Sequence, residues 1–234
     1  MRALADLTLD EPSAGPPRVA LGDGSLLIWL QRAAIPEEEQ KRILERYLGC
    51  LDRLRGENAP VAAFVSRPQS AEVVALLYLA HLDPEERHSV KRLSDTGFRG
   101  LTDRALFGTL EPGERSALYV RGTASNREFQ HRGHTVYFFY LNTGTDLARV
   151  EVPEWVARQP AKLDLVHATV YNQCTFNKGY PYVLTRADDL AVILGDEREA
   201  LENLIAQALL RNGLPWPELS RKAQQKQVAR WRRR

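Results

Sequence analysis

The order of apolar patterns in the first third of the chain is the feature that most constrains its fold. Arg18–Leu30 carries apolar β-forming residues around a Gly-Asp-Gly-Ser turn, which predicts a strand, a bend and then a second strand or an extended continuation. A helix is predicted to begin at Pro36, because three glutamates follow it and apolar residues then recur at helical spacing. Pro60–Val65 has the length of a strand, and Ala71–Leu82 resembles a largely buried helix. Strand, helix, strand and helix in this order predict an α/β layer.

The second half of the chain predicts an antiparallel hairpin and a helical C-terminus. Turn residues between two apolar runs favour a hairpin, and apolar residues at helical spacing predict helices further on. The predicted strands are 116–121, 135–141 and 148–152, with a turn at 142–145, and the predicted helices are 102–110, 163–173 and 198–211. The predicted fold class is therefore α/β, with a mixed sheet flanked by helices.

Composition narrows the class of protein further. The chain has 234 residues, of which 44% are hydrophobic, and this is enough to build a core. With 2 cysteines, a disulfide framework is excluded and a reducing compartment is favoured. The apolar runs are too short to span a membrane, and acidic residues occupy the N-terminus where a signal peptide would be apolar. We expect a soluble cytoplasmic protein.

Positive charge is concentrated at the C-terminus. The last fourteen residues, 221–234, contain seven Lys or Arg and no acid, so the formal charge of +2 leaves the preceding residues at −5. Such a tail suits a polyanion such as nucleic acid, because clustered cations release condensed counterions, and a solubilising or assembly role is the alternative. The predicted organisation is a Pro-rich leader with little structure at 1–17, a domain at 18–219 and a basic tail at 220–234.

Asp23 is the first candidate for a functional residue. It lies in the sequence Gly-Asp-Gly-Ser at the predicted end of a strand, where a carboxylate beside two glycines leaves room for a metal ion and a phosphate. An Asp-Gly pair between apolar runs is more often a simple turn. A second candidate pair is Tyr180 and Asp188, where Gly179 and Pro181 favour a helix that begins at Pro181. The alternative there is a helix entry with exposed acids.

Other charged residues are weaker candidates. Arg149 and Glu151 alternate on a predicted strand and so share a face, where they form a surface pair or line a cleft with Arg149 on a phosphate. Arg67 follows a predicted strand and is either a phosphate contact or a solvated loop residue. His131 and His134 lie in a glycine-containing turn and are expected to be solvated. The sequence contains no phosphate-binding glycine loop, nucleophile elbow or dinucleotide fingerprint.

The order and spacing of seven segments resemble the NurA family of DNA-end-processing nucleases, particularly its bacterial branch. The resemblance covers about residues 18–230. It implies an RNase H-like core, a divalent-metal site using Mn²⁺ or Mg²⁺, a homodimer, and HerA, a hexameric ATPase, as partner. The segments are DGSLLIW, VSRPQSAEVV, LEPGERSALY, VYFFYLNTG, ARVEVPEWV, GYPYVLTRAD, and Ser220 to Lys222 with Lys226.

The resemblance also implies roles for individual residues. Asp23 would be a catalytic metal ligand, and Tyr180 the tyrosine of the family's Gly-Tyr-Pro motif. Asp188 stands where the family usually has His; an aspartate can ligate the metal, but it donates a proton at neutral pH only if its pKa is strongly raised. Lys222 and Lys226, together with the arginines named above, are the expected DNA contacts. An earlier Asp-Gly-Ser motif and a following Glu of the family are not found, so the sequence suggests a domain that is incomplete at its N-terminus.

The function expected from the resemblance is metal-dependent hydrolysis of DNA. It would be of the single-strand endonuclease and 5′-3′ exonuclease type, in DNA end resection during double-strand-break repair. The alternative is a catalytically incomplete scaffold of the same fold that binds DNA or the HerA ATPase. Charge alone also leaves open an RNA-processing factor with an RNase H-like core.

Overall fold

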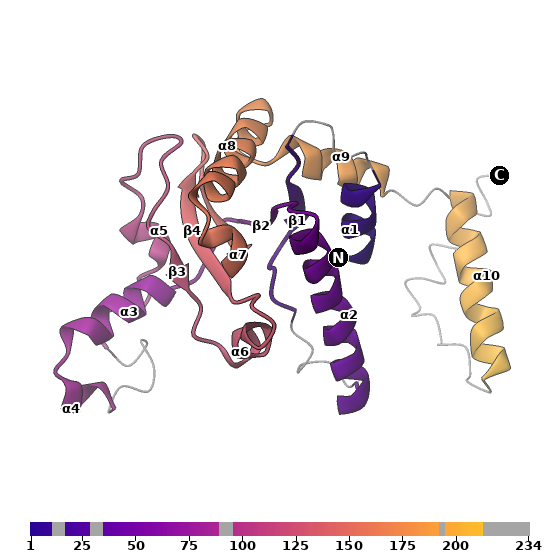
Figure 1. Cartoon of the computed structure of the whole chain (residues 1–234), viewed down its shortest axis with the longest axis horizontal. Helices are drawn as coiled ribbons and strands as arrows, with labels where there is room; N and C mark the ends of the chain where they lie inside the picture. The colour runs from indigo at the N-terminus through magenta and orange to yellow at the C-terminus, as the bar shows by residue number, and fades with distance from the viewer. Residues whose placement is uncertain (11–16, 29–34, 89–95, 192–194, 213–234) are drawn as a thin grey trace, which may run out of the picture. The chain divides into compact units, whose positions relative to one another are not determined.

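The computed structural model describes residues 1–10, 17–28, 35–88, 96–191 and 195–212 (Figure 1). Within these ranges the strands are β1 (Ala20–Asp23), β2 (Val61–Ser66), β3 (Tyr119–Val120), β4 (Val136–Asn142) and β5 (Leu147–Pro153). The helices are α1 (Arg2–Leu9), α2 (Glu37–Gly56), α3 (Glu72–His81), α4 (Pro84–Arg87), α5 (Asp103–Leu106), α6 (Ala124–Gln130), α7 (Glu154–Ala157), α8 (Pro160–Phe176), α9 (Tyr182–Leu190) and α10 (Gly195–Arg211).

The chain divides into two compact units, Met1–Ala187 and Asp188–Arg234. The first unit contains the whole sheet, and the second contains the last residues of α9 and all of α10. This boundary differs from the predicted one, which placed residues 18–219 in a single domain. Among the described residues, no helix is both long and apolar enough to cross a membrane.

One mixed sheet organises the first unit. Its strand order is β1-β2-β5-β4-β3, with β1 and β2 parallel and the remaining pairs antiparallel. The parallel pair is joined through α2, as the alternation of strand and helix patterns predicted, and β4 and β5 form the predicted hairpin. The predicted α/β class with a mixed, helix-flanked sheet and a helical C-terminal region is confirmed; an RNase H-like core stays a prediction.

Alternation along the central hairpin gives the sheet two apolar faces. Val150 and Phe139 are register partners and belong to the main core, which also receives Leu51 of α2 and Val166 of α8. On the opposite face, Phe138 and Tyr140 of β4 pack with Val73 of α3 in a smaller cluster. Helices therefore cover both faces, and burial of each large apolar side chain contributes about 1.5–3 kcal/mol.

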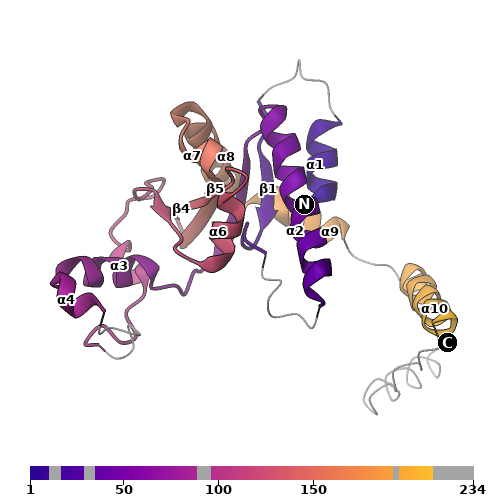
Figure 2. The ribbon, with the colours of Figure 1, turned by 60° about the horizontal axis from the view of Figure 1, so that its bottom comes forward.

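The prediction of an irregular leader is wrong for residues 2–9, which form α1. This helix lies beside α2 in both views (Figures 1 and 2), and its Ala5 is fully buried. Arg53 of α2 forms an ion pair with Asp6 at 2.7 Å, and the Arg18 side chain donates a hydrogen bond to the carbonyl of Thr8. The Pro and Gly residues after residue 11 predicted a loop for the whole segment, but the apolar residues that precede them form a short helix that packs on α2.

Two predictions of burial are also wrong. α3 was expected to be largely buried, but Leu76 and Leu77 are 54% and 51% exposed, because the helix covers the small cluster with its first turn only. His134 was expected to be solvated, but it is completely buried, and its Nε2 lies 2.8 Å from Asp52 Oδ1 of α2. His131, in the same turn, is exposed as expected.

Candidate functional site

The candidate site lies at the sheet edge where the parallel strands β1 and β2 both end. Asp23 is the last residue of β1, and Ser66 and Arg67 come at the end of β2. Because Ser66 pairs with Ala148, the β4–β5 turn reaches the same edge. Ligands in α/β proteins commonly bind beyond the carboxyl ends of parallel strands, and this edge is therefore the natural place to look for a site.

Asp23 presents an exposed carboxylate at this edge. The chain turns away immediately after it, because Gly24 adopts φ = +83°, a left-handed conformation that side-chain-bearing residues rarely take. Among the described residues, neither a hydrogen bond nor an ion pair engages the Asp23 carboxylate. It is therefore open to a ligand that approaches from solvent.

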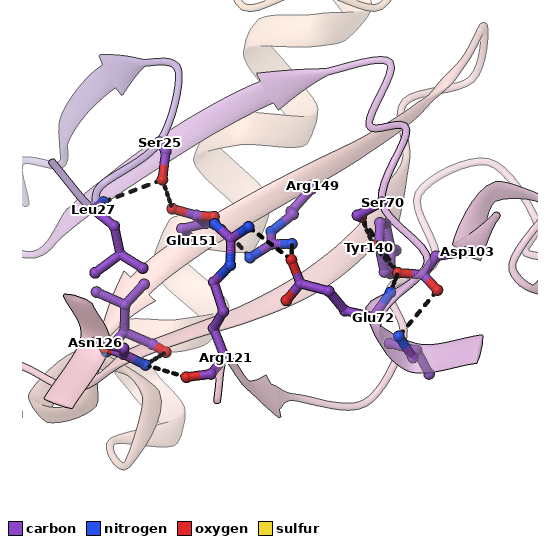
Figure 3. Close-up of polar contacts among 12 residues, drawn as sticks. Ser25, Leu27, Ser70, Glu72, Asp103, Arg121, Asn126, Tyr140, Arg149 and Glu151 are labelled. Atoms are coloured by element: carbon purple, nitrogen blue, oxygen red, sulfur yellow. Dashed lines mark hydrogen bonds and ion pairs between the residues drawn. The ribbon is translucent and has the colours of Figure 1, made fainter. Parts of the chain in front are cut away.

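Glu151 of β5 fixes the turn that follows Asp23 (Figure 3). The hydroxyl of Ser25 and the backbone N–H of Leu26 both donate to Glu151 Oε2 at 2.8 Å. The Ser25 hydroxyl also accepts a bond from the Leu27 N–H. Glu151 is 1% exposed, so these bonds hold the turn from within the protein. Ser25 in the Asp-Gly-Ser motif thus acts as an anchor, a role that the sequence analysis did not assign.

Tyr180 lies on the same part of the sheet as Asp23. Its ring packs edge-on against Phe64, with ring centroids 5.5 Å apart, and Phe64 is the register partner of Asp23 on β2. Aligned residues of neighbouring strands point to the same face, so Asp23 and Tyr180 flank the same phenylalanine. Glu151 is aligned with Ala63, one position earlier, and therefore belongs to the opposite face.

Gly179 of the Gly-Tyr-Pro sequence lets this segment approach the β4–β5 turn. Its φ is +91°, and a Cβ atom at this position would lie 1.8 Å from Thr145 Oγ1. Thr145 in turn donates a hydrogen bond to the carbonyl of Lys178 at 3.0 Å. The glycine is thus required both for its backbone conformation and for space.

Asp188 and the residues of this edge belong to different compact units. Asp188 is exposed on α9 and is the first residue of the second compact unit. α9 begins at Tyr182, one residue after the predicted start. The role that the resemblance implies for Asp188 stays a sequence prediction, and Lys222 and Lys226 lie outside the described residues.

Arg149 belongs to a partly buried chain of alternating charges (Figure 3). It pairs with Glu151 at 2.9 Å and with Glu72 of α3 at 3.2 Å, and Glu72 also pairs with Arg121 at 2.9 Å. The guanidinium carbon of Arg149 lies 3.7 Å from the ring centroid of Phe138. The expected pair of Arg149 and Glu151 is present, but it is buried and not at the surface. Since Arg149 is 3% exposed and paired to two glutamates, its geometry argues against contact with DNA phosphate.

Asp103 is a second buried carboxylate that the sequence analysis missed. Its Oδ1 accepts the N–H groups of Val73 and Val74, and its Oδ2 accepts the N–H of Glu72 and the hydroxyl of Tyr140, all at 2.6–3.0 Å. These amides are the first of α3, which has no side-chain cap of its own. Burial and the bond to Asp103 raise the pKa of Tyr140 above its ordinary value. An acid at the start of a predicted helix was the only sequence signal for this residue.

The donor set at the edge fits a weakly held divalent cation. Among the residues that the structure describes, no group of three or more His, Cys, Asp or Glu side chains is arranged to hold a metal ion. Mg²⁺, however, is commonly held by one or two carboxylates together with water and substrate phosphates. The open oxygens of Asp23 meet that requirement, whereas Glu151 and Asp103 already accept hydrogen bonds.

Fold and site define an α/β protein with an open carboxylate at the carboxyl end of its parallel strands. The sequence matches the NurA domain family over residues 1–193, and the chain therefore belongs to this family. The matched range includes α1, which the sequence analysis had set aside as a leader.

One solved structure with a similar fold is that of the NurA nuclease from Sulfolobus solfataricus. It shares 15% sequence identity with the chain, at a TM-score of 0.47 over 91% of this chain. The chain spans 66% of the length of that structure. No curated protein matches the sequence.

Proposed function

We propose that this protein is a divalent-cation-dependent nuclease that hydrolyses DNA. The observation that carries the proposal is the open carboxylate of Asp23, at the carboxyl end of β1 in a chain that matches the NurA domain over residues 1–193. The activity proposed is of the single-strand endonuclease and 5′-3′ exonuclease type.

Mn²⁺ or Mg²⁺ is the proposed cofactor, and Asp23 is the residue that would hold it. When bound, such a cation supplies activation of water and stabilisation of charge on the leaving oxygen of a phosphodiester. Ser25, held by buried Glu151, fixes the turn and hence the direction of the Asp23 carboxylate. Tyr180, fixed by its contact with Phe64, would stand beside the scissile phosphate. A single protein carboxylate predicts that cation binding strengthens when DNA contributes phosphate oxygens.

The proposed setting is DNA end resection in double-strand-break repair, in the cytoplasm. The partners proposed are a second copy of the chain and a HerA-type hexameric ATPase, as the resemblance implies. Lys222 and Lys226 in the basic tail would add sequence-independent contacts to DNA phosphates.

The test compares Asp23→Asn with the unaltered full chain on labelled single-stranded DNA in the presence of Mn²⁺. Removing a residue that only hydrogen-bonds to a metal ligand commonly lowers metal affinity or activity about 10- to 100-fold. Loss of the ligand itself should therefore reduce the rate of cleavage at least about 100-fold. Asp10→Asn is the matched control, since Asp10 is an exposed carboxylate at the end of α1. Cleavage retained in Asp23→Asn would remove this residue from the mechanism.

A second function, a scaffold that binds DNA or the ATPase without cutting, is favoured by one observation. The described part of the chain contributes one open carboxylate to the site, whereas phosphodiester hydrolysis commonly uses several. Under this alternative, wild-type chain and Asp23→Asn bind single-stranded DNA equally and neither cleaves it with Mn²⁺ or Mg²⁺. Metal-dependent cleavage by the wild-type chain would exclude the scaffold.

A further inference from the structure

The β4–β5 turn gathers positive side chains from separate parts of the chain. Arg67, directly after β2, donates from Nε to Asp146 Oδ2 at 2.9 Å, and Arg104 of α5 contacts Asp146 Oδ1 at 2.5 Å. One carboxylate thus holds two guanidinium groups. Both remain exposed, Arg67 at 80% and Arg104 at 48%, while Asp146 is 21% exposed.

The charge at this turn is not balanced. Two arginines face one aspartate, which leaves one positive charge in excess. Lys178 adds a further positive charge beside the turn. Its backbone carbonyl accepts the hydrogen bond from Thr145, which places this exposed residue next to the turn. Burial acts to raise the pKa of Asp146, but the Leu147 N–H, Arg67 and Arg104 lower it overall. The carboxylate therefore stays charged and keeps both arginines in place at neutral pH.

Two residues that lie beside this turn have a strained backbone. Arg67 has φ = +47° and Lys178 has φ = +51°, left-handed values that cost a residue with a side chain about 1 kcal/mol or more. A glycine would relieve this strain at either position. Strained residues persist where the surrounding structure requires their position, and here both are cations at the edge that carries Asp23 and Tyr180.

We propose that Arg67 and Arg104, oriented by Asp146 and supplemented by Lys178, form a clamp for the phosphate backbone of a DNA strand next to Asp23. This inference rests on the proposed function for its substrate and adds the residues that hold it. Guanidinium groups suit the role because each offers several donors in a plane that matches phosphate oxygens. Both arginine side chains keep exposed surface while they contact Asp146, so a phosphate can bind without breaking those contacts.

The test measures binding of labelled single-stranded DNA by fluorescence anisotropy, with full chain, in EDTA and at KCl concentrations from about 0.05 to 0.3 M. Each phosphate contact to a single strand contributes about 0.7 to the slope of log K against log salt. Arg67→Ala with Arg104→Ala should therefore lower the slope by about 1.4 and weaken binding roughly 10- to 100-fold at the lowest salt. Arg67→Lys with Arg104→Lys should keep the slope, because the charges remain.

Arg158→Ala is the matched control. Arg158 is 69% exposed and paired with a carboxylate, Glu154, at 2.6 Å, but it follows β5 at the opposite end of the sheet. It should leave both affinity and slope unchanged. Thermal unfolding of each variant checks that the fold is intact.

An unchanged slope in the folded double alanine variant would overturn the clamp, and so would an equal loss in Arg158→Ala. If the double alanine variant is unfolded, the double lysine variant decides, since a loss of slope there would contradict a charge-based clamp. Cleavage is a separate measurement with Mn²⁺. A chain that binds DNA through this clamp and does not cut would refute the nuclease and leave the clamp intact.

Discussion

Asp103 shows how one buried side chain can replace a missing helix cap. The residue before α3 is Ala71, whose side chain cannot accept a hydrogen bond, and the first amides of the helix would be unsatisfied without Asp103. The carboxylate also lies at the positive end of the helix dipole, which favours its negative charge. It comes from α5, about thirty positions further along the chain.

We predict that Asp103→Asn destabilises the protein by about 3 kcal/mol. The amide group places a donor against the N–H groups of α3 and the Tyr140 hydroxyl, and each buried group left without a partner costs about 1–3 kcal/mol. Urea unfolding followed by circular dichroism measures the change. Asp164→Asn serves as control, because this exposed partner of Arg115 should change stability by no more than about 0.5 kcal/mol. Equal effects of the two substitutions would contradict the capping role.

For single residues, the sequence predicts the place in a strand or turn better than it predicts which distant side chains the residue contacts. The Asp-Gly-Ser and Gly-Tyr-Pro patterns predicted that Asp23 ends a strand and that a helix begins close after Tyr180, because turn residues have strong local preferences. The anchoring of Ser25 by Glu151 and the contact of Gly179 with Thr145 depend on strands distant in sequence. No local pattern carries that information, and Arg149 was accordingly expected either in a surface pair or in a cleft on a DNA phosphate.

Among the elements, α2 is joined to the start of β4 through a buried histidine. His134 Nε2 lies 2.8 Å from Asp52 Oδ1, and Arg132 pairs with Asp52 and with Glu45. The other ring nitrogen, Nδ1, is buried and has no hydrogen-bond partner among the residues that the structure describes. Burial lowers the pKa of His134, because the charged imidazolium is poorly solvated there; Asp52 opposes this shift, and the charges of Arg55 and Arg132 add to it.

This histidine should make the fold less stable in mild acid. Its pKa is lower in the folded than in the unfolded chain, so between the unfolded value of about 6.5 and the lower folded value the unfolded state binds more protons. The free energy of unfolding therefore falls as pH drops through this window and is fully retained above it. Urea titrations at a series of pH values from about 7 to 5 should show a steeper fall for wild type than for His134→Gln. Parallel curves for the two proteins would refute this assignment.

The local sequence pattern predicts where helices and strands lie more often than it predicts how deeply each of them is buried. β2, β4, β5 and α2 lie close to their predicted ranges, because period-two and helical patterns mark them clearly. The exposure of α3 could not be predicted in this way, since its continuous apolar run resembles a buried helix. Which face such a helix covers depends on the sheet beneath it.

At the scale of the whole molecule, charge is distributed unevenly, and this has a measurable consequence for DNA binding. The seven cations of residues 221–234 form a basic segment with no acid, while the remainder of the chain is net negative. Deletion of residues 221–234 should weaken binding of single-stranded DNA and lower its salt dependence, because fewer counterions are released. Anisotropy titrations with the full and shortened chains measure both quantities. Identical titrations would reassign this segment to solubility or assembly.

The bond between Ser25 and Glu151 joins residues 126 positions apart. During synthesis, the nascent chain will have released the Asp-Gly-Ser turn long before β5 leaves the ribosome to hold it. Strands β1 and β2 can meet earlier, but their shared edge acquires its final form only when the hairpin inserts beside β2. A nascent chain that has not yet released β5 therefore lacks the bond that holds this turn, and any cutting activity would have to await the emergence of that strand.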